Sequence, residues 1–87
     1  MYPVYELLVE AHAERDLRRL EPEALRRVVD HIKSLAGNPR PPGSRKIVGS
    51  ENDWRVRVGT YRVVYEIDDR ARQVRIMCVR HRREAYR

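Results

Sequence analysis

The stretch WRVRVGTYRVVY, residues 54–65, decides how this chain folds. Apolar and arginine side chains alternate strictly over 54–58, which is the period of a strand with one buried face. A second apolar run, 61–67, follows after Gly59 and Thr60. A two-residue connection that starts with glycine suits a type II′ turn, so the stretch predicts an antiparallel β-hairpin.

The predicted turn fixes which residues face each other across the hairpin: Val58 and Tyr61, Arg57 and Arg62, Val56 and Val63, Arg55 and Val64. Three arginines then share one face of the sheet, and two of them are direct neighbours. Like charges in that arrangement destabilise a sheet by roughly 0.2–1 kcal/mol. We therefore interpret this face as a binding surface for an anion, and expect the opposite face, with its valines and aromatic residues, to pack under helices.

Charge is distributed unevenly along the 87 residues. Residues 1–44 are neutral overall, whereas residues 45–87 carry the whole net charge of +6. The basic residues are 17 Arg and two Lys, and the arginine side chain is suited to bidentate contact with phosphate. This asymmetry predicts a polyanionic partner.

Length and composition indicate a single domain over residues 1–87 and limit its chemistry. Cys78, the lone cysteine, fits a reducing compartment, and its place in an apolar run indicates a small buried side chain. No apolar run approaches the ~18–20 residues that span a bilayer, so we expect a cytoplasmic protein without a membrane partner. No residue cluster has metal-ligand spacing and no glycine-rich phosphate loop is present, so we predict neither a metal nor a cofactor.

Hydrophobic periodicity predicts the remaining elements, which are helices at 11–20 and 22–36 and candidate strands at 4–9, 45–48 and 73–80. The two helices are separated by almost nothing, which favours an antiparallel helical hairpin. The element order is read as β-α-α-β-β-β. We predict an α+β fold in which the N-terminal helical hairpin packs on one face of a mostly antiparallel four-stranded sheet.

Four segments, taken in chain order, match a known family pattern. They are A-x-x-D-L-x-x-L (13–20), K-I-V-G (46–49), W-R-V-R-V-G-T-Y-R-V-V-Y-E-I (54–67) and V-R-H-R-R-E-A-Y-R (79–87). Together they resemble the RelE/ParE superfamily of bacterial and archaeal toxins, and the match runs nearly end to end. Its most specific parts are R-V-G-x-Y-R-V-x-Y and the closing H-R-x-x-x-Y.

The resemblance implies the toxin of a type II toxin–antitoxin pair. RelE-type members are mRNA interferases, ribosome-dependent endoribonucleases that cut mRNA in the A site by attack of a 2′-hydroxyl on the adjacent phosphate. We predict this metal-independent activity, with the ribosome, mRNA and a cognate RelB-like antitoxin as partners. The alternative is a ParE-type toxin, which shares the fold, poisons DNA gyrase and lacks the nuclease residues. A third hypothesis is an RNA-binding module that has lost catalysis.

The resemblance also implies site residues: catalytic Arg57, Arg62, His81, Arg82 and Tyr86, and phosphate-binding Lys46, Arg55, Arg80 and Arg83. Arg57 and Arg62 would hold the scissile phosphate, and Arg82 would stabilise the transition state or the leaving group, because cations stabilise a pentacovalent phosphorane. Arg55 would bind a neighbouring phosphate and Tyr86 would stack on a base. Without such binding, the arginines would be solvated residues on a strand surface.

The proton acceptor is the open part of this hypothesis. RelE-type members often carry lysine where Arg55 and Arg57 stand, and arginine is a poor base because it stays protonated. His81 is one candidate, since an imidazole ordinarily titrates near neutral pH; otherwise it tethers the tail by a hydrogen bond. Glu66 and Glu84 are weaker candidates, which we expect to pair with arginines. Cleavage without any of them would depend on electrostatics and positioning.

Overall fold

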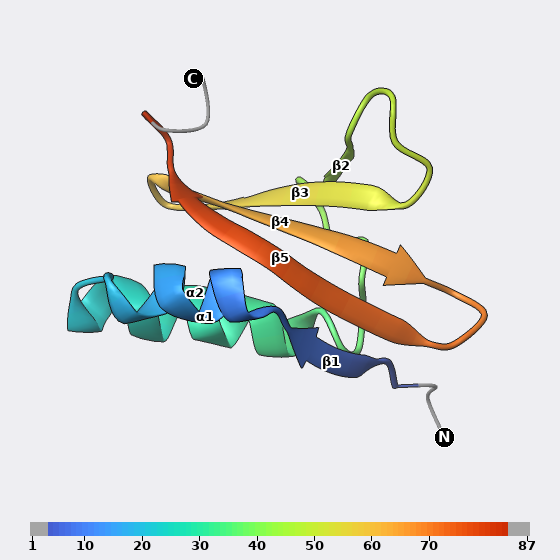
Figure 1. Cartoon of the computed structure of the whole chain (residues 1–87), viewed down its shortest axis with the longest axis horizontal. Helices are drawn as coiled ribbons and strands as arrows, with labels where there is room; N and C mark the ends of the chain where they lie inside the picture. Colours follow the sequence, from blue (N-terminus) through green and yellow to red (C-terminus); the bar gives the residue numbers. More distant parts are fainter. Residues whose placement is uncertain (1–3, 84–87) are drawn as a thin grey trace.

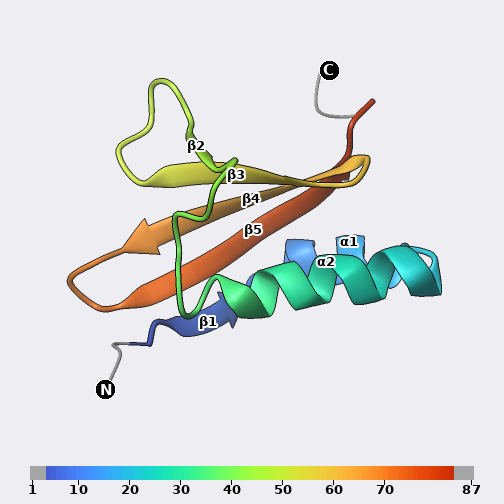
Figure 2. The ribbon, with the colours of Figure 1, turned by 180° about the vertical axis from the view of Figure 1, so that it is seen from behind.

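The computed structural model describes residues 4–83, which form two helices on a mixed five-stranded sheet (Figure 1, Figure 2). The elements are β1 (Glu6–Val9), α1 (Ala11–Arg18), α2 (Pro22–Ser34), β2 (Arg45–Lys46), β3 (Asp53–Val58), β4 (Tyr61–Asp68) and β5 (Gln73–His81). The strand order is β1-β5-β4-β3-β2, with β1 parallel to β5 and the other neighbouring pairs antiparallel.

The α+β class and the helical hairpin are confirmed, but the prediction of four strands is wrong by one. The fifth strand is β2, a two-residue strand at the start of the candidate segment 45–48, which pairs with Trp54 and Arg55 of β3 and was not counted among the four. Both helices lie on one side of the sheet, and no helix within residues 4–83 covers the other side (Figure 1, Figure 2). Within the described residues, the face of the sheet opposite the helices is therefore available to contact a ligand.

The core lies between the helices and the sheet face that the alternation predicted to be buried. From the hairpin it takes Val56, Val58, Val63 and Tyr65, each at most 5% exposed. From the helical half it takes Ala13 of α1 and three residues at helical spacing, Val28, Ile32 and Leu35. Trp54 and Tyr61 are half-buried at the edges of this core.

The hairpin has the register predicted from its turn, with Val58 opposite Tyr61 and Arg57 opposite Arg62. Gly59 has a φ of 61°, a conformation that a residue with a Cβ rarely adopts and that the first position of a type II′ turn requires. A Cβ at Gly59 would meet Arg27 Nη1 only at 3.6 Å. The backbone conformation, rather than a lack of space, is thus the reason for glycine.

A polar cluster fastens the proline-rich loop to the far end of the sheet. Arg40 donates a 2.9 Å hydrogen bond from Nη2 to Asp69 Oδ2, and the Tyr5 hydroxyl donates to Asp69 Oδ1 at 2.6 Å. The guanidinium of Arg40 also lies 5.1 Å from the centroid of the Trp54 ring. These contacts lower the pKa of Asp69 below its ordinary value, first through the hydrogen bond from Arg40 and then through that from Tyr5.

Candidate nucleic-acid interface

The uncovered face of the sheet carries a row of three arginines across three adjacent strands. Arg57 of β3 lies opposite Arg62 of β4, and Arg62 lies opposite Arg80 of β5. Directly opposed residues have Cβ atoms only about 4.5–5.5 Å apart. We call the surface that bears Arg55, Arg57, Arg62 and Arg80 the arginine face.

A second row lies beside the first and is only partly cationic. Arg45 of β2 faces Arg55 of β3, which faces Val64 of β4, which faces Cys78 of β5. Arg45 thus adjoins the arginine face, although the sequence analysis did not include it among the site residues. Its pairing with Arg55 depends on β2, and the sequence pattern gave no indication of which residue of that short segment faces this side.

Burial differs strongly along the first row. Arg62 retains only 8% of its surface exposed because β4 is the central strand of the sheet, whereas Arg57 and Arg80 are exposed. Arginine can bury its aliphatic stem while its charged end reaches the surface. The row therefore presents charge at its two ends and a largely covered arginine at its centre.

The acidic residues of the described chain do not neutralise the β3 arginines. Within residues 4–83, no ion pair involves Arg55 or Arg57. Glu66 lies on the same face but is 3.8 Å from Arg75, which also lies 3.5 Å from Glu10. The expectation that Glu66 pairs with an arginine is confirmed.

Two hollows on this face share Arg62. A small one of about 50 Å³ lies beside the hairpin turn and is lined by Gly59, Thr60, Tyr61, Arg57, Arg62 and Arg82. A larger one of about 260 Å³ is lined by Ile47, Arg55, Arg62, Val64, Cys78 and Arg80. The backbone N–H of Arg82 donates to the Thr60 carbonyl at 2.6 Å, which holds Arg82 beside the turn. Four other predicted site arginines, Arg55, Arg57, Arg80 and Arg82, therefore line these hollows together with Arg62.

His81 is placed differently from these arginines. It lies opposite Tyr61, on the side of the sheet that faces the helices, and its ring meets the Tyr61 ring edge-on with centroids 5.3 Å apart. Its Nδ1 accepts a 3.2 Å hydrogen bond from the backbone N–H of Arg83. These contacts correspond to the tethering alternative, and they direct His81 away from the row formed by Arg57 and Arg62.

The other predicted site residues are not all on the arginine face. Lys46 lies opposite Trp54 and so projects to the other side of the sheet. Arg83 is exposed beyond the end of β5, and Tyr86 and Glu84 lie outside the described residues. Cys78, expected to be buried, is instead half-buried on the arginine face.

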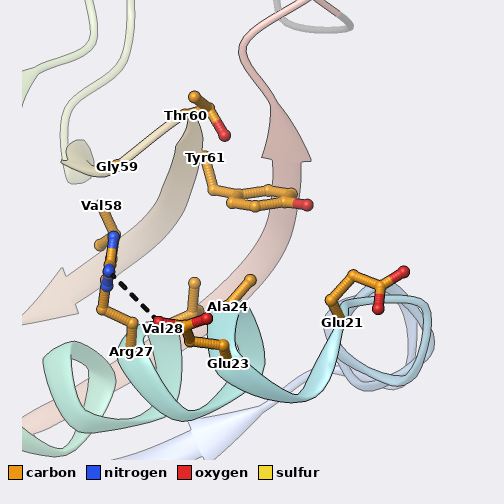
Figure 3. Close-up of a pocket in the computed structure, with 9 residues that line it drawn as sticks. All are labelled: Glu21, Glu23, Ala24, Arg27, Val28, Val58, Gly59, Thr60 and Tyr61. Atoms are coloured by element: carbon orange, nitrogen blue, oxygen red, sulfur yellow. Dashed lines mark ion pairs between the residues drawn. The ribbon is translucent and has the colours of Figure 1, made fainter.

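A further cleft, of about 330 Å³, lies on the helix side between the start of α2 and the β3–β4 turn (Figure 3). Its floor is apolar, with Ala24, Val28 and Val58, but two glutamates stand at its rim. Glu23 is 4.0 Å from Arg27, the one basic residue of the lining. This cleft holds none of the predicted catalytic residues, and its carboxylates make it a poor site for a polyanion.

The arginine face is equipped to bind phosphates and to stabilise negative charge on them. Arginine presents five donors in a planar fork and stays charged, so it can hold a phosphate in both the ground and the transition state.

The described residues bring together no group of three or more His, Cys, Asp or Glu side chains that could hold a metal. No helix in residues 4–83 is long and apolar enough to cross a membrane.

Comparison with known proteins shows the class to which this fold and surface belong. Residues 7–86 match the family model of the ParE toxin of the type II toxin–antitoxin system parDE. The chain is 38% identical over 79 residues to toxin RelG of Mycobacterium tuberculosis, covering 86% of this chain and 87% of that protein. It is 36% identical over 69 residues to the putative toxin RelE1 of Methanocaldococcus jannaschii, covering 71% and 77%. The chain belongs to the RelE/ParE superfamily of toxins.

Solved structures agree with this assignment. The toxin–antitoxin complex RelBE2 of Mycobacterium tuberculosis contains a chain that is 32% identical, with a TM-score of 0.80 over 91% of this chain and 99% of that one. The archaeal RelE–RelB complex of Pyrococcus horikoshii gives a TM-score of 0.82 at 23% identity, over 91% of this chain and 96% of that one, which shows a shared fold.

Proposed function

We propose that this toxin is a ribosome-dependent endoribonuclease that cuts mRNA in the A site by attack of a 2′-hydroxyl on the adjacent phosphate. Arg57 and Arg62 hold the scissile phosphate, and Arg55 and Arg80 bind phosphates beside it. Arg82, held at the hairpin turn, stabilises the phosphorane or the departing 5′-oxygen. The bond from the 2′-oxygen to phosphorus forms as the bond to the 5′-oxygen breaks, while water takes the 2′-hydroxyl proton and supplies one to the departing oxygen. The products are a fragment that ends in a cyclic phosphate and a fragment that begins with a 5′-hydroxyl, and no metal or cofactor takes part in the proposed step.

The observation that supports this proposal is the three-strand row Arg57–Arg62–Arg80, with Arg82 at its end. Opposing guanidiniums repel each other across a sheet. A bound polyanion removes that cost and gains charge-assisted hydrogen bonds of about twice the usual strength. Preorganised cations aimed at developing charge are generally the largest single contribution to such catalysis.

Within residues 4–83, the arginine face offers no good proton acceptor beside the row, because its arginines stay protonated and Glu66 pairs with Arg75. The Nδ1 atom of His81 accepts the hydrogen bond from Arg83 N–H, so in the neutral ring Nε2 carries the hydrogen and has no lone pair with which to take the 2′-hydroxyl proton. The place of His81 beside Tyr61 favours a role in tethering the residues after β5. We propose that catalysis depends on positioning and charge stabilisation, and that His81→Gln retains most of the cleavage activity.

A cognate antitoxin is the proposed partner. The relatives of known structure in RelBE2 of Mycobacterium tuberculosis and in the RelE–RelB complex of Pyrococcus horikoshii were solved bound to their antitoxins. The net charge of +6 favours an acidic protein that covers the arginine face and so competes with RNA. We propose a cytoplasmic location, because the proposed substrate is mRNA on the ribosome.

A gyrase-poisoning activity is the second candidate, because the matching family model is that of ParE over residues 7–86. The absence of lysine at positions 55 and 57 also fits a toxin without nuclease chemistry. Under this alternative the arginine face would contact protein or DNA rather than a scissile phosphate.

A translating extract separates the two candidates. Purified toxin is added, and the 5′ ends of the message are mapped while DNA supercoiling by gyrase is assayed in parallel. We expect new message ends within A-site codons and undisturbed supercoiling. Intact message together with failed supercoiling would overturn the nuclease proposal in favour of gyrase poisoning.

A further inference from the structure

We propose that the hollow lined by Ile47, Arg55, Arg62, Val64, Cys78 and Arg80 binds one nucleobase of the RNA, beside the phosphate site on the first arginine row. This inference rests on the proposed function and deepens it, because it assigns a base-binding site to an apolar part of the arginine face. We call this hollow the Cys78 pocket.

The register of the sheet places this pocket one step from the arginine row. Val64 follows Arg62 by two residues on β4, and Cys78 precedes Arg80 by two residues on β5. Residues i and i+2 of a strand lie on one face roughly 6.6 Å apart. Val64 and Cys78 also face each other directly, so they form a small apolar floor next to the cationic row. A phosphate bound on the row thus places an attached base near this floor.

The chemistry of the lining suits a base better than a second phosphate. Val64, Cys78 and Ile47 offer an apolar surface for the flat face of a ring, while Arg55, Arg62 and Arg80 line the rim. Guanidinium planes stack on bases and donate to their carbonyl and ring-nitrogen acceptors. The volume of about 260 Å³ is below the roughly 300–1,000 Å³ usual for drug-sized ligands. It therefore suits a single heterocycle rather than a whole nucleotide.

Cys78 supplies a site-specific reporter for this pocket. It is the only cysteine in the sequence and is half-buried in the lining. The rate at which N-ethylmaleimide alkylates the protein therefore measures the accessibility of this one thiol. A base that occupies the pocket covers the thiol, whereas a phosphate held on the arginine row alone leaves it accessible.

The experiment compares the alkylation rate of Cys78 in the full chain with two ligands of equal charge. One is a five-nucleotide RNA and the other is the same ribose-phosphate chain without bases. At ten times its dissociation constant, the RNA should slow alkylation about tenfold. The abasic chain should bind about 5- to 150-fold more weakly, because that is the contribution of stacking one base. When the abasic chain is added at a concentration that gives the same occupancy as the RNA, the rate of Cys78 alkylation should stay near that of the free protein.

Equal protection by both chains at equal occupancy would overturn the pocket, and so would RNA binding with no protection. The A-site cleavage assay reports the proposed function separately. Cleavage without base-dependent protection removes the pocket and keeps the nuclease. Base-dependent protection without cleavage keeps the pocket and removes the nuclease.

A matched pair of variants provides an independent test. Val64→Glu places a carboxylate among the rim arginines and should abolish base-dependent protection and RNA binding. Val48→Glu makes the same change in charge at a fully exposed position outside the pocket and should retain both. Thermal unfolding verifies that both variants fold, and equal RNA affinity of two folded variants would overturn the assignment.

Discussion

The two faces of the β3–β4 hairpin differ completely in composition and in what they contact. On the helix side, Val56, Val58 and Val63 are almost fully buried in the core that they share with residues of the helical half. On the other side, Arg55 and Arg57 form no ion pair within residues 4–83, and no helix of that segment covers them. One face of these strands thus packs in the hydrophobic core, and the other face bears the arginines of the proposed RNA site.

This arrangement makes stability and function separable by mutation. Neighbouring residues of one strand point to opposite faces, so single substitutions one position apart should produce opposite phenotypes. A core substitution should lower stability, and activity only as far as the protein unfolds. Substitution of the exposed Arg57 should lower activity and leave stability unchanged, or raise it by removing repulsion.

Ile67→Ala should give the largest loss of stability on the hairpin. Ile67 is 2% exposed in the core, and truncating a buried isoleucine to alanine typically costs about 2–5 kcal/mol. Urea unfolding followed by circular dichroism measures this loss. The remaining folded fraction should cut mRNA at the wild-type rate, and a folded variant with impaired cleavage would contradict the separation of the two faces.

Arg62→Ala and Arg82→Ala should each reduce the rate of mRNA cleavage by about 10²–10³, or roughly 2.7–4 kcal/mol of transition-state stabilisation. Each loses a cation that would stabilise the phosphorane. Single-turnover cleavage on programmed ribosomes measures the effect. Arg26→Ala, which removes the same charge from an exposed position of α2, is the control and should cleave normally. If Arg62→Ala and Arg82→Ala both cleave normally, the site assignment fails.

Tyr65→Phe should lower stability by about 1–2 kcal/mol without changing cleavage by folded protein. The buried Tyr65 hydroxyl donates a 2.7 Å hydrogen bond to the Pro39 carbonyl, and the phenylalanine ring would leave that oxygen without its donor. Thermal unfolding measures the loss. Wild-type stability would show that the carbonyl finds another donor.

Asp69→Asn should have the smallest effect, a few tenths to about 1 kcal/mol, because the Arg40–Asp69 pair is largely exposed and therefore screened. Folding lowers the pKa of Asp69, so its contribution is present above the unfolded pKa and is lost as the pH falls through the folded pKa. Unfolding free energies measured from neutral to acidic pH should converge for the two proteins below both pKa values. A constant difference at every pH would contradict the ion-pair origin.

The hairpin, its register and its two faces could be predicted from the sequence because they depend on local rules. A two-residue turn with glycine first allows one register, and strict alternation assigns each side chain to a face. The helices were predicted at nearly their observed bounds for the same reason, since their apolar stripe repeats at helical spacing.

The positions of Cys78 and Lys46 on the sheet depend on contacts that no local sequence pattern reveals. Ile76 and Val79 are both buried although three positions apart, because the register between β4 and β5 shifts after Val64. That irregularity turns Cys78 outward to the arginine face, although the apolar run around it favoured burial. The face on which Lys46 lies, and the shortening of the candidate strand 45–48 to two residues, likewise follow from pairing with β3, which lies beyond a loop.

The rate of A-site mRNA cleavage by Arg57→Ala tests most directly the claim that the arginine face serves RNA rather than the fold. Arg57 is exposed and forms no ion pair within the described residues, so its truncation removes no ion pair there. We predict a fall in rate of about 10²-fold or more at an unchanged melting temperature, with Arg26→Ala at the wild-type rate. Equal rates for Arg57→Ala, Arg26→Ala and the wild type would contradict the account.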